Sequence, residues 1–104
     1  KSYHLSYSII VMKYVAWEPK KNERLKTERG ISFEEVIEAI VDEQVIGRFP
    51  HPNQERYPSQ QVYVVAVDEY VYIIPFVEDE ENIFLKTIYP SRKYTKKYIE
   101  KGGI

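Results

Sequence analysis

The stretch FLKTIYPSRKY, residues 84–94, joins the two features that decide this fold, an apolar strand and a basic helix. Its first half alternates between the two faces of a pleated strand, so that Leu85 and Tyr89 share one face. Pro90 ends the strand because proline has no N–H to donate to a neighbouring strand. The sequence therefore predicts a strand over 82–89 that stops abruptly.

A helix over 92–101 is predicted to follow at once, because Ser91 is a preferred N-cap residue. Its first turn carries Arg92, Lys93 and Tyr94. The first N–H groups of a helix have no partner inside the helix, and they favour anions. Backbone and side chains together predict a site for an anion such as a phosphate. A solvated basic helix that only closes the domain is the alternative.

The composition favours one domain with a locally cationic surface. The chain has 104 residues, enough for a single core, and its formal net charge is -1. The whole molecule therefore lacks the strong positive balance of a protein that binds nucleic acid by charge alone. Residues 34–43 and 78–81 are acidic, whereas 20–29 and 86–101 are mostly basic, so a cationic surface is predicted on a nearly neutral protein.

Several classes of site are excluded or disfavoured. The chain has no cysteine, which rules out disulfides, thiolate zinc sites and thiol catalysis. With two histidines a metal enzyme is a poor interpretation, and we predict neither a metal nor another cofactor. The longest apolar run near the start, Ile9 to Met12, is too short to span a bilayer or to form a signal peptide. We therefore expect a cytoplasmic protein with no membrane partner.

Residues 1–11 alternate in polarity as a tyrosine-rich strand does. Because Met12 is able to serve as an initiator, they are either a native strand or an extension. We therefore expect three parts: residues 1–11, a single domain over 12–101 and a short tail over 102–104. A strand at the start would expose an edge able to pair with a second copy, which predicts a homodimer.

An αα-hairpin is predicted after a strand over 14–17. Pro19 suits the first turn of a helix over 20–28, in which Leu25 alone is strongly apolar. We expect this helix to lie on the surface with five polar side chains free: Lys21, Asn22, Arg24, Lys26 and Arg29.

A second helix is predicted from a capping box, in which the Ser32 side chain accepts from the Glu35 N–H and Glu35 accepts from the Ser32 N–H. The apolar stripe over 33–41 predicts that this helix packs on the core. Gly30 between the two helices is a common helix stop.

Three strands are predicted over 61–67, 70–77 and 82–89, with a brief edge strand over 45–49. Their short connections favour antiparallel neighbours. Pro75 requires a bulge in the middle strand or an outward-facing position. The predicted fold class is α+β: an antiparallel sheet in the order β-α-α-β-β-β-α, with the αα-hairpin packed on it and a basic C-terminal helix.

This order, with particular residues, resembles the BrnT-like toxins of bacterial type II toxin-antitoxin modules, which belong to the RelE-like group. The resemblance spans about residues 13–98 and is carried by WEPKK at 17–21, GISFEE at 30–35 and SRKYTKK at 91–97. It implies a RelE-like fold and a metal-independent endoribonuclease that cleaves messenger RNA. It also implies a cognate antitoxin that neutralises the enzyme, and contact with operator DNA only through the complex of the two.

The resemblance assigns the basic residue of the first helix to Lys21 and the arginine that opens the last helix to Arg92. Where the family usually has histidine before the glycine, this chain has Arg29. A strand arginine of the family falls on Thr87, with Lys86 as its neighbour on the opposite face.

Cleavage of RNA without a metal requires deprotonation of the 2′-hydroxyl, neutralisation of the phosphorane charge and protonation of the 5′-oxygen. Arg92 is the first candidate for stabilising the phosphorane and Arg29 the second, because a guanidinium matches two phosphate oxygens. Lys21 assists them or acts as the base. His51, in a loop over 50–58, is a further candidate because histidine is a common general acid or base, and a structural turn residue is the alternative for it.

Further RNA contacts are predicted for the cations and aromatic residues of the same segments. These candidates are Lys86, Lys93, Tyr94, Lys97, Tyr98 and Trp17. Packing is the alternative role for the aromatic ones. The alternative function is a non-catalytic module whose basic face binds an antitoxin-like acidic segment or nucleic acid. Catalysis predicts that Lys21, Arg29 and Arg92 surround one concavity, whereas binding alone predicts a ridge.

Overall fold

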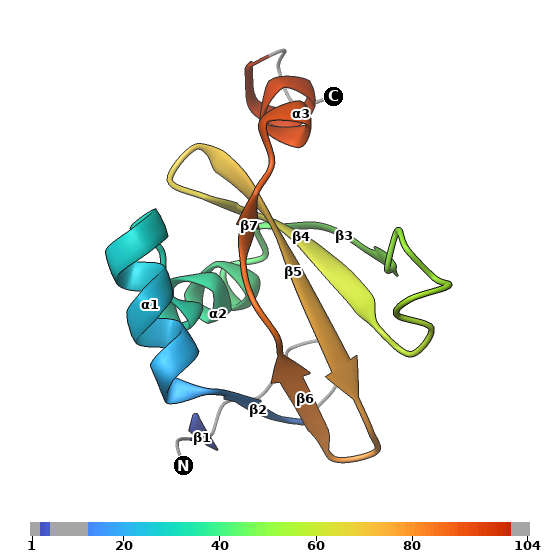
Figure 1. Ribbon diagram of the computed structural model, residues 1–104. Helices are drawn as coiled ribbons and strands as arrows, with labels where there is room; N and C mark the ends of the chain where they lie inside the picture. Colours follow the sequence, from blue (N-terminus) through green and yellow to red (C-terminus); the bar gives the residue numbers. More distant parts are fainter. Residues whose placement is uncertain (1–2, 5–12, 101–104) are drawn as a thin grey trace.

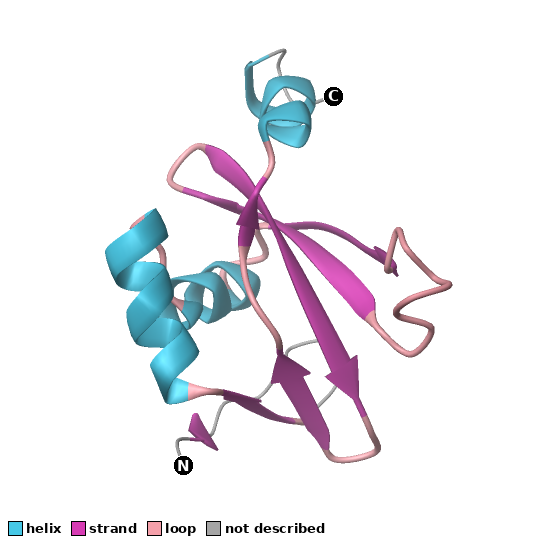
Figure 2. Ribbon diagram, viewed as in Figure 1, coloured by secondary structure: helices cyan, strands magenta, loops and turns pink. Residues whose placement is uncertain are grey.

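The computed structural model describes residues 3–4 and 13–100, which form a small α+β domain on one mixed sheet (Figures 1 and 2). The parts of the predictions that fall on residues 1–2, 5–12 and 101–104 lie outside the described residues. No helix in the described part is long and apolar enough to cross a membrane.

The helices are α1 (Pro19–Arg29), α2 (Phe33–Val41) and α3 (Arg92–Thr95), the last continuing as a π-helical turn, η1 (Lys96–Glu100). The strands are β1 (Tyr3–His4), β2 (Tyr14–Trp17), β3 (Val45–Pro50), β4 (Gln61–Val67), β5 (Tyr70–Glu78), β6 (Asn82–Leu85) and β7 (Tyr89–Pro90). Most bounds agree with the sequence prediction to within a residue or two, but the predicted strand over 82–89 is split into β6 and β7.

The strand order is β1-β2-β6-β5-β4-β3, and β7 pairs with β5 as well. The prediction of an antiparallel sheet is wrong at one pairing, since β2 runs parallel to β6 with Trp17 opposite Leu85. Parallel neighbours need a long connection, and here the whole of residues 18–81 provides it. The pairing places the start of α1 beside the start of the basic stretch that follows β6.

Helices α1 and α2 cover one face of the sheet (Figure 1). The predicted capping box of α2 is confirmed, since Ser32 Oγ accepts from the Glu35 N–H at 3.2 Å and Glu35 Oε1 accepts from the Ser32 N–H at 2.9 Å. Phe33 and Val36 are fully buried in the core that this helix forms with the sheet. Periodicity and capping therefore decide this part of the fold.

Helix α3 and the turn η1 cover part of the other face. Tyr94, Tyr98 and Ile99 pack there against Val62, Val64 and Val71 of the sheet. Strand β4 is therefore buried on both faces, which explains why its sequence, QVYVVAV, is almost continuously apolar.

Asn22 locks the αα-hairpin, although the sequence predicted a free side chain. It is 3% exposed, donates to Glu34 Oε1 at 2.8 Å and accepts from the Phe33 N–H at 2.8 Å. Burial raises the pKa of Glu34. The hydrogen bond from Asn22, a hydrogen bond from the Glu34 backbone and the positive charge of Lys26 outweigh burial, so the pKa is lowered overall. The amide thus fixes the direction of α1 relative to the start of α2.

Pro75 explains why the last strand is split. The register between β4 and β5 is unbroken, so the irregularity lies on the other side of β5. The Lys86 N–H donates to the Pro75 carbonyl at 2.8 Å. In an antiparallel pair, the N–H and C=O of one residue face the same neighbouring strand. Proline has no N–H, so it cannot donate the second hydrogen bond of this pair. Pairing with β5 resumes only at Tyr89.

Candidate functional site

The segment from Lys86 to Arg92, named here the exit segment, leads from β6 through β7 into α3 and contains two of the predicted cations. Thr87 and Ile88 are both buried, whereas Lys86, Tyr89 and Arg92 are exposed. Strict alternation from Leu85 would bury Tyr89 and expose Ile88. The missing ladder bond at Pro75 allows residues 86–88 to leave the sheet and reverse this pattern.

Arg29, at the end of α1, is bound to the exit segment. Its Nη1 donates to the Ile88 carbonyl at 2.5 Å, and its Cζ lies 5.2 Å from the centre of the Tyr89 ring. Gly30 follows with a left-handed φ of 67° and ends the helix there. Arg29 is thus anchored rather than free, yet its exposed guanidinium keeps donors that this single hydrogen bond does not use.

The start of α3 is held by buried hydroxyl groups. Ser91 Oγ accepts from the Tyr94 N–H at 3.1 Å, as its predicted capping role requires. Thr95 Oγ1 accepts from the Val71 N–H at 2.8 Å and donates to the Ser91 carbonyl at 2.7 Å. Because Ser91 uses the Tyr94 N–H, the predicted backbone contribution to an anion site is reduced. The exposed side chain of Arg92 projects from a backbone fixed on both sides.

Lys21 is half-buried and lies near the opposite end of α1 from Arg29. The two residues are eight positions apart, which corresponds to about 12 Å along the helix axis. Lys21 is therefore near the level of the β2–β6 pairing, whereas Arg29 contacts the exit segment close to α3. The structure brings Arg29 and Arg92 to one segment and leaves Lys21 at a distance.

His51 has a local structural role in the loop between β3 and β4. Its Nδ1 accepts from the Asn53 N–H at 2.9 Å, its carbonyl accepts from Gln54 Nε2, and its ring lies 4.5 Å from that of Tyr57. Strand β3 is at one edge of the sheet, and α1 follows β2 on the other side of β6. The geometry therefore matches the turn-residue alternative and separates His51 from Arg29.

The three predicted RNA-binding lysines are exposed and lie along aromatic rings. Each Nζ is 5.1–5.6 Å from a ring centre: Lys86 over Phe84, Lys93 over Tyr94 and Lys97 over Tyr98. These contacts cover the aromatic rings while leaving the ammonium groups in solvent. The lysines therefore remain able to contact phosphate.

The three predicted aromatic RNA contacts are mainly packing residues. Trp17 is 6% exposed and stacks on Phe33 in the core, which leaves it no open face for a base. Tyr94 and Tyr98 are half-buried, with ring centres 5.8 Å apart, against Val62, Val64 and Val71 of the sheet. The sequence did not single out Tyr89, which is 47% exposed.

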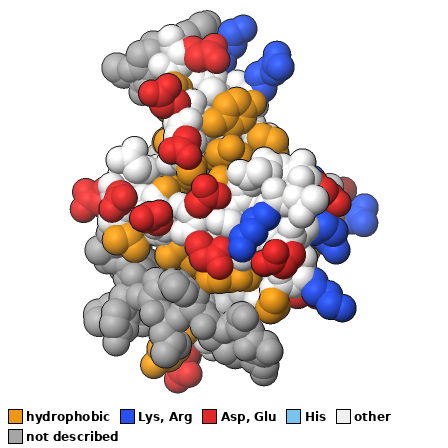
Figure 3. Space-filling view, turned by 90° about the vertical axis from the view of Figure 1, so that its left-hand side faces the viewer, with side chains coloured by type: hydrophobic (Ala, Val, Ile, Leu, Met, Phe, Trp, Pro, Cys, Tyr) orange, Lys and Arg blue, Asp and Glu red, His pale blue; other side chains and the backbone are white. Residues whose placement is uncertain are grey.

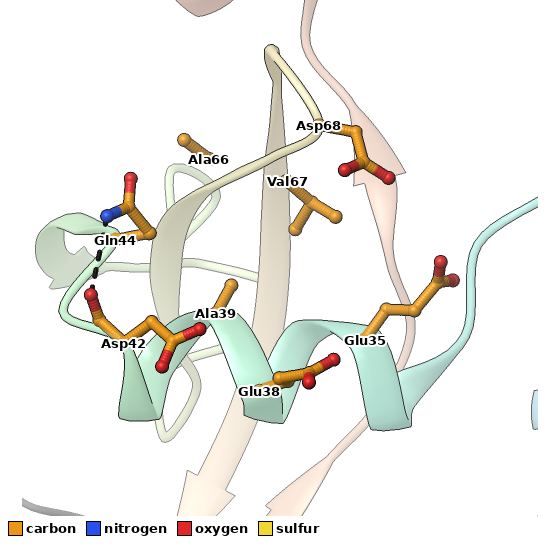
Figure 4. Close-up of a pocket in the computed structure, with 8 residues that line it drawn as sticks. All are labelled: Glu35, Glu38, Ala39, Asp42, Gln44, Ala66, Val67 and Asp68. Atoms are coloured by element: carbon orange, nitrogen blue, oxygen red, sulfur yellow. Dashed lines mark hydrogen bonds between the residues drawn. The ribbon is translucent and has the colours of Figure 1, made fainter.

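An acidic hollow lies between α2 and the turn that joins β4 to β5, and strand β7 of the exit segment passes beside it (Figure 4). Carboxylates of Glu35, Glu38, Asp42 and Asp68 surround it, and Gln44 donates to the Asp42 carbonyl at 3.3 Å. Within residues 3–4 and 13–100, no group of three His, Asp or Glu side chains is arranged to hold a metal ion. The carboxylates make this hollow unfavourable for phosphate.

The exposed cations do not form a single patch on the face turned toward the viewer in Figure 3. Lys and Arg side chains gather at the top, where α3 lies, and again lower on the right, with acidic side chains between and beside them. Because the carboxylates between them repel phosphate, this face offers two separate groups of cations rather than a continuous cationic track.

Comparison with protein-family models, with curated proteins and with solved structures found no match. The site is therefore defined by its own geometry: Arg29 docked on the exit segment, Arg92 at its end, and Lys86 at its start.

Proposed function

We propose that this chain is a metal-independent endoribonuclease toxin of a toxin-antitoxin module, and that the exit segment with Arg29 contacts the RNA. The proposal includes a RelE-like assignment of the fold, supported by the order strand, two helices, strands and C-terminal helix. It rests first on the resemblance carried by the sequence.

The observation that supports it best is the docking of Arg29 onto Ile88. Ile88 is four residues before Arg92, so at most about 14 Å of chain separates the two attachment points. Arginine side chains from both points are long enough to contact one phosphate or two adjacent phosphates. Two of the four candidate catalytic residues are thus attached to one short segment although they are far apart in the sequence.

In the proposed reaction the 2′-oxygen attacks the adjacent phosphorus and the bond from phosphorus to the 5′-oxygen breaks. The products are a 2′,3′-cyclic phosphate and a 5′-hydroxyl, and the proton lost by the 2′-hydroxyl is balanced by the one gained by the leaving oxygen. Arg92 and Arg29 stabilise the added charge of the phosphorane through charge-assisted hydrogen bonds. Lys21 and His51 stay candidates for proton transfer only in a rearranged complex.

The positions of Lys21 and His51 favour a second candidate function, a non-catalytic module that binds RNA or an acidic antitoxin segment. Lys21 and His51 are the predicted proton-transfer groups, and neither lies with Arg29 and Arg92. Binding needs only the cations, which are spread along the exit segment and α3. Under either function we propose that a cognate antitoxin covers this surface and that operator DNA is contacted through their complex.

The test is induced expression in bacteria followed by incubation of purified protein with RNA in EDTA. The wild type should slow growth and produce fragments that end in 2′,3′-cyclic phosphate, and Arg92→Ala should do neither. Arg56→Ala is the matched control, because Arg56 is also exposed and lies over a tyrosine, at 5.5 Å, but in the loop after β3. Binding of RNA without cleavage by the wild type would favour the module. Neither binding nor cleavage of RNA would refute the nuclease and would leave only a module that binds an acidic protein segment.

A further inference from the structure

Tyr89 stands out among the exposed apolar side chains. Tyr14, Val41, Phe49 and Tyr89 are each 47–48% exposed in the described part of the chain. Tyr89 differs in carrying an arginine on its ring, since Arg29 Cζ lies 5.2 Å from the ring centre. An exposed aromatic ring that is fixed in place is a surface on which a nucleobase is able to stack.

The sheet fixes the backbone of Tyr89, and Arg29 lies over its ring. The Tyr89 backbone pairs with Ile73 in the ladder between β5 and β7, and the following Ser91 N–H donates to the Val71 carbonyl at 2.8 Å. The guanidinium that lies over the ring is itself anchored to the Ile88 carbonyl. A ring held in this way loses little conformational entropy when a base stacks on it, so the site is preorganised.

Cations flank this ring along the chain. Lys86 is three residues before Tyr89 and Arg92 three residues after it, and both are exposed. Three residues span at most about 11 Å, so both side chains are within reach of phosphates next to a base stacked on Tyr89. Unpaired RNA supplies this combination of a free base face and neighbouring phosphates, whereas a duplex keeps its bases stacked on each other.

We propose that Tyr89, held under Arg29, is the stacking platform for one unpaired base of single-stranded RNA, with Lys86 and Arg92 on the adjacent phosphates. This inference rests on the proposed contact with RNA and adds the substrate class, unpaired rather than duplex RNA. It assigns to Tyr89 the stacking role that the sequence assigned to Trp17, Tyr94 and Tyr98.

The test measures binding of a fluorescein-labelled 2′-O-methyl uridylate dodecamer, which has no 2′-hydroxyl to support cleavage, by fluorescence anisotropy. Tyr89→Ala and Tyr89→Leu should weaken binding by roughly 5- to 150-fold, and Tyr89→Trp should retain it within about twofold. The matched control is Phe49→Ala, because Phe49 is equally exposed but lies on β3 at the edge of the sheet, and it should change affinity less than twofold.

Salt dependence and a duplex probe complete the test. Lys86→Ala should lower the slope of log affinity against log salt by about 1, whereas Tyr89→Ala should leave the slope unchanged because it removes no charge. A duplex of the same length should bind wild type and Tyr89→Ala equally.

Two outcomes separate this inference from the proposed function. If Arg92→Ala weakens binding while Tyr89→Ala binds like the wild type, RNA contact survives and the stacking platform is refuted. If the wild type binds no RNA, both fail. Wild-type affinity in Tyr89→Leu would also refute stacking, because leucine keeps apolar bulk without an aromatic face.

Discussion

The amide of Asn22 should be one of the largest single contributors to stability outside the hydrophobic core, and Asn22→Ala tests this. The side chain is 3% exposed and bridges the Glu34 carboxylate and the Phe33 N–H at 2.8 Å each. Alanine removes both hydrogen bonds and leaves a buried N–H at the start of α2 without this partner. No other part of the helix is able to supply one, since the first N–H groups of a helix have no acceptor within it.

The magnitude follows from these two bonds. Each hydrogen bond contributes about 1 kcal/mol net, and an unsatisfied buried donor costs about 1–3 kcal/mol. We therefore expect Asn22→Ala to lower the free energy of unfolding by about 2–4 kcal/mol. For a domain of this size that corresponds to a fall in Tm of roughly 10–25 °C.

Urea denaturation followed by fluorescence provides the assay, since Trp17 is the single tryptophan and is buried in the core. The control is Asn53→Ala in the loop after β3, where an exposed amide accepts from the Arg56 N–H at 3.1 Å, and it should cost less than about 1 kcal/mol. If Asn22→Ala were within about 0.5 kcal/mol of Asn53→Ala, the argument that a buried amide locks the hairpin would be refuted.

Three further predictions concern the ends of the elements that hold the exit segment. Gly30→Ala should cost about 1 kcal/mol in a thermal melt, because φ is 67° and an added Cβ meets nothing within 4 Å, so the cost is conformational. Thr95→Val should cost about 2–3 kcal/mol in urea denaturation, because the Val71 N–H and Ser91 carbonyl lose their buried partner, whereas Thr95→Ser should keep most of that stability. Asp79 has a pKa below its usual value because the Glu81 and Asn82 N–H groups donate to it. Its stabilisation is therefore present above about pH 4 and lost as pH falls through the native pKa, so Asp79→Asn should lose less stability between about pH 5 and pH 3 than the wild type does.

Each of these three predictions has a result that would contradict it. An unchanged melting temperature in Gly30→Ala would contradict the left-handed cap. Equal instability of Thr95→Ser and Thr95→Val would show that packing, rather than hydrogen bonding, explains the role of Thr95. Parallel acid profiles for the wild type and Asp79→Asn would contradict the link between that carboxylate and folding.

The sequence predicted the caps and turns that depend on residues close together in the chain. The capping box at Ser32 and Glu35, the strands on either side of Asp68 and Glu69, and the cap at Ser91 all depend on residues within a few positions of each other. Asp68 and Glu69 adopt positive φ values of 50° and 66°, which suit the tight turn that the sequence predicted there.

The sequence did not predict the parallel pairing of β2 with β6 or the docking of Arg29. Both depend on contacts between residues more than fifty positions apart, and a single sequence carries no pattern for such pairs. The polarity of Asn22 predicted an exposed side chain. The side chain is buried instead, because the N-terminus of α2 supplies a donor for its amide oxygen. At the candidate site the sequence identified Arg29 and Arg92 but not Tyr89, whose exposure follows from the break in the ladder opposite Pro75.

The central claim is that Arg29 and Arg92 act on the same RNA at the exit segment. A double-mutant cycle on the affinity for the 2′-O-methyl dodecamer, with Arg29→Ala, Arg92→Ala and the double variant, tests it most directly. The claim predicts an interaction energy above about 0.5 kcal/mol, because both guanidinium groups contact one phosphate or neighbouring phosphates. Strictly additive losses, or no loss in either single variant, would contradict it.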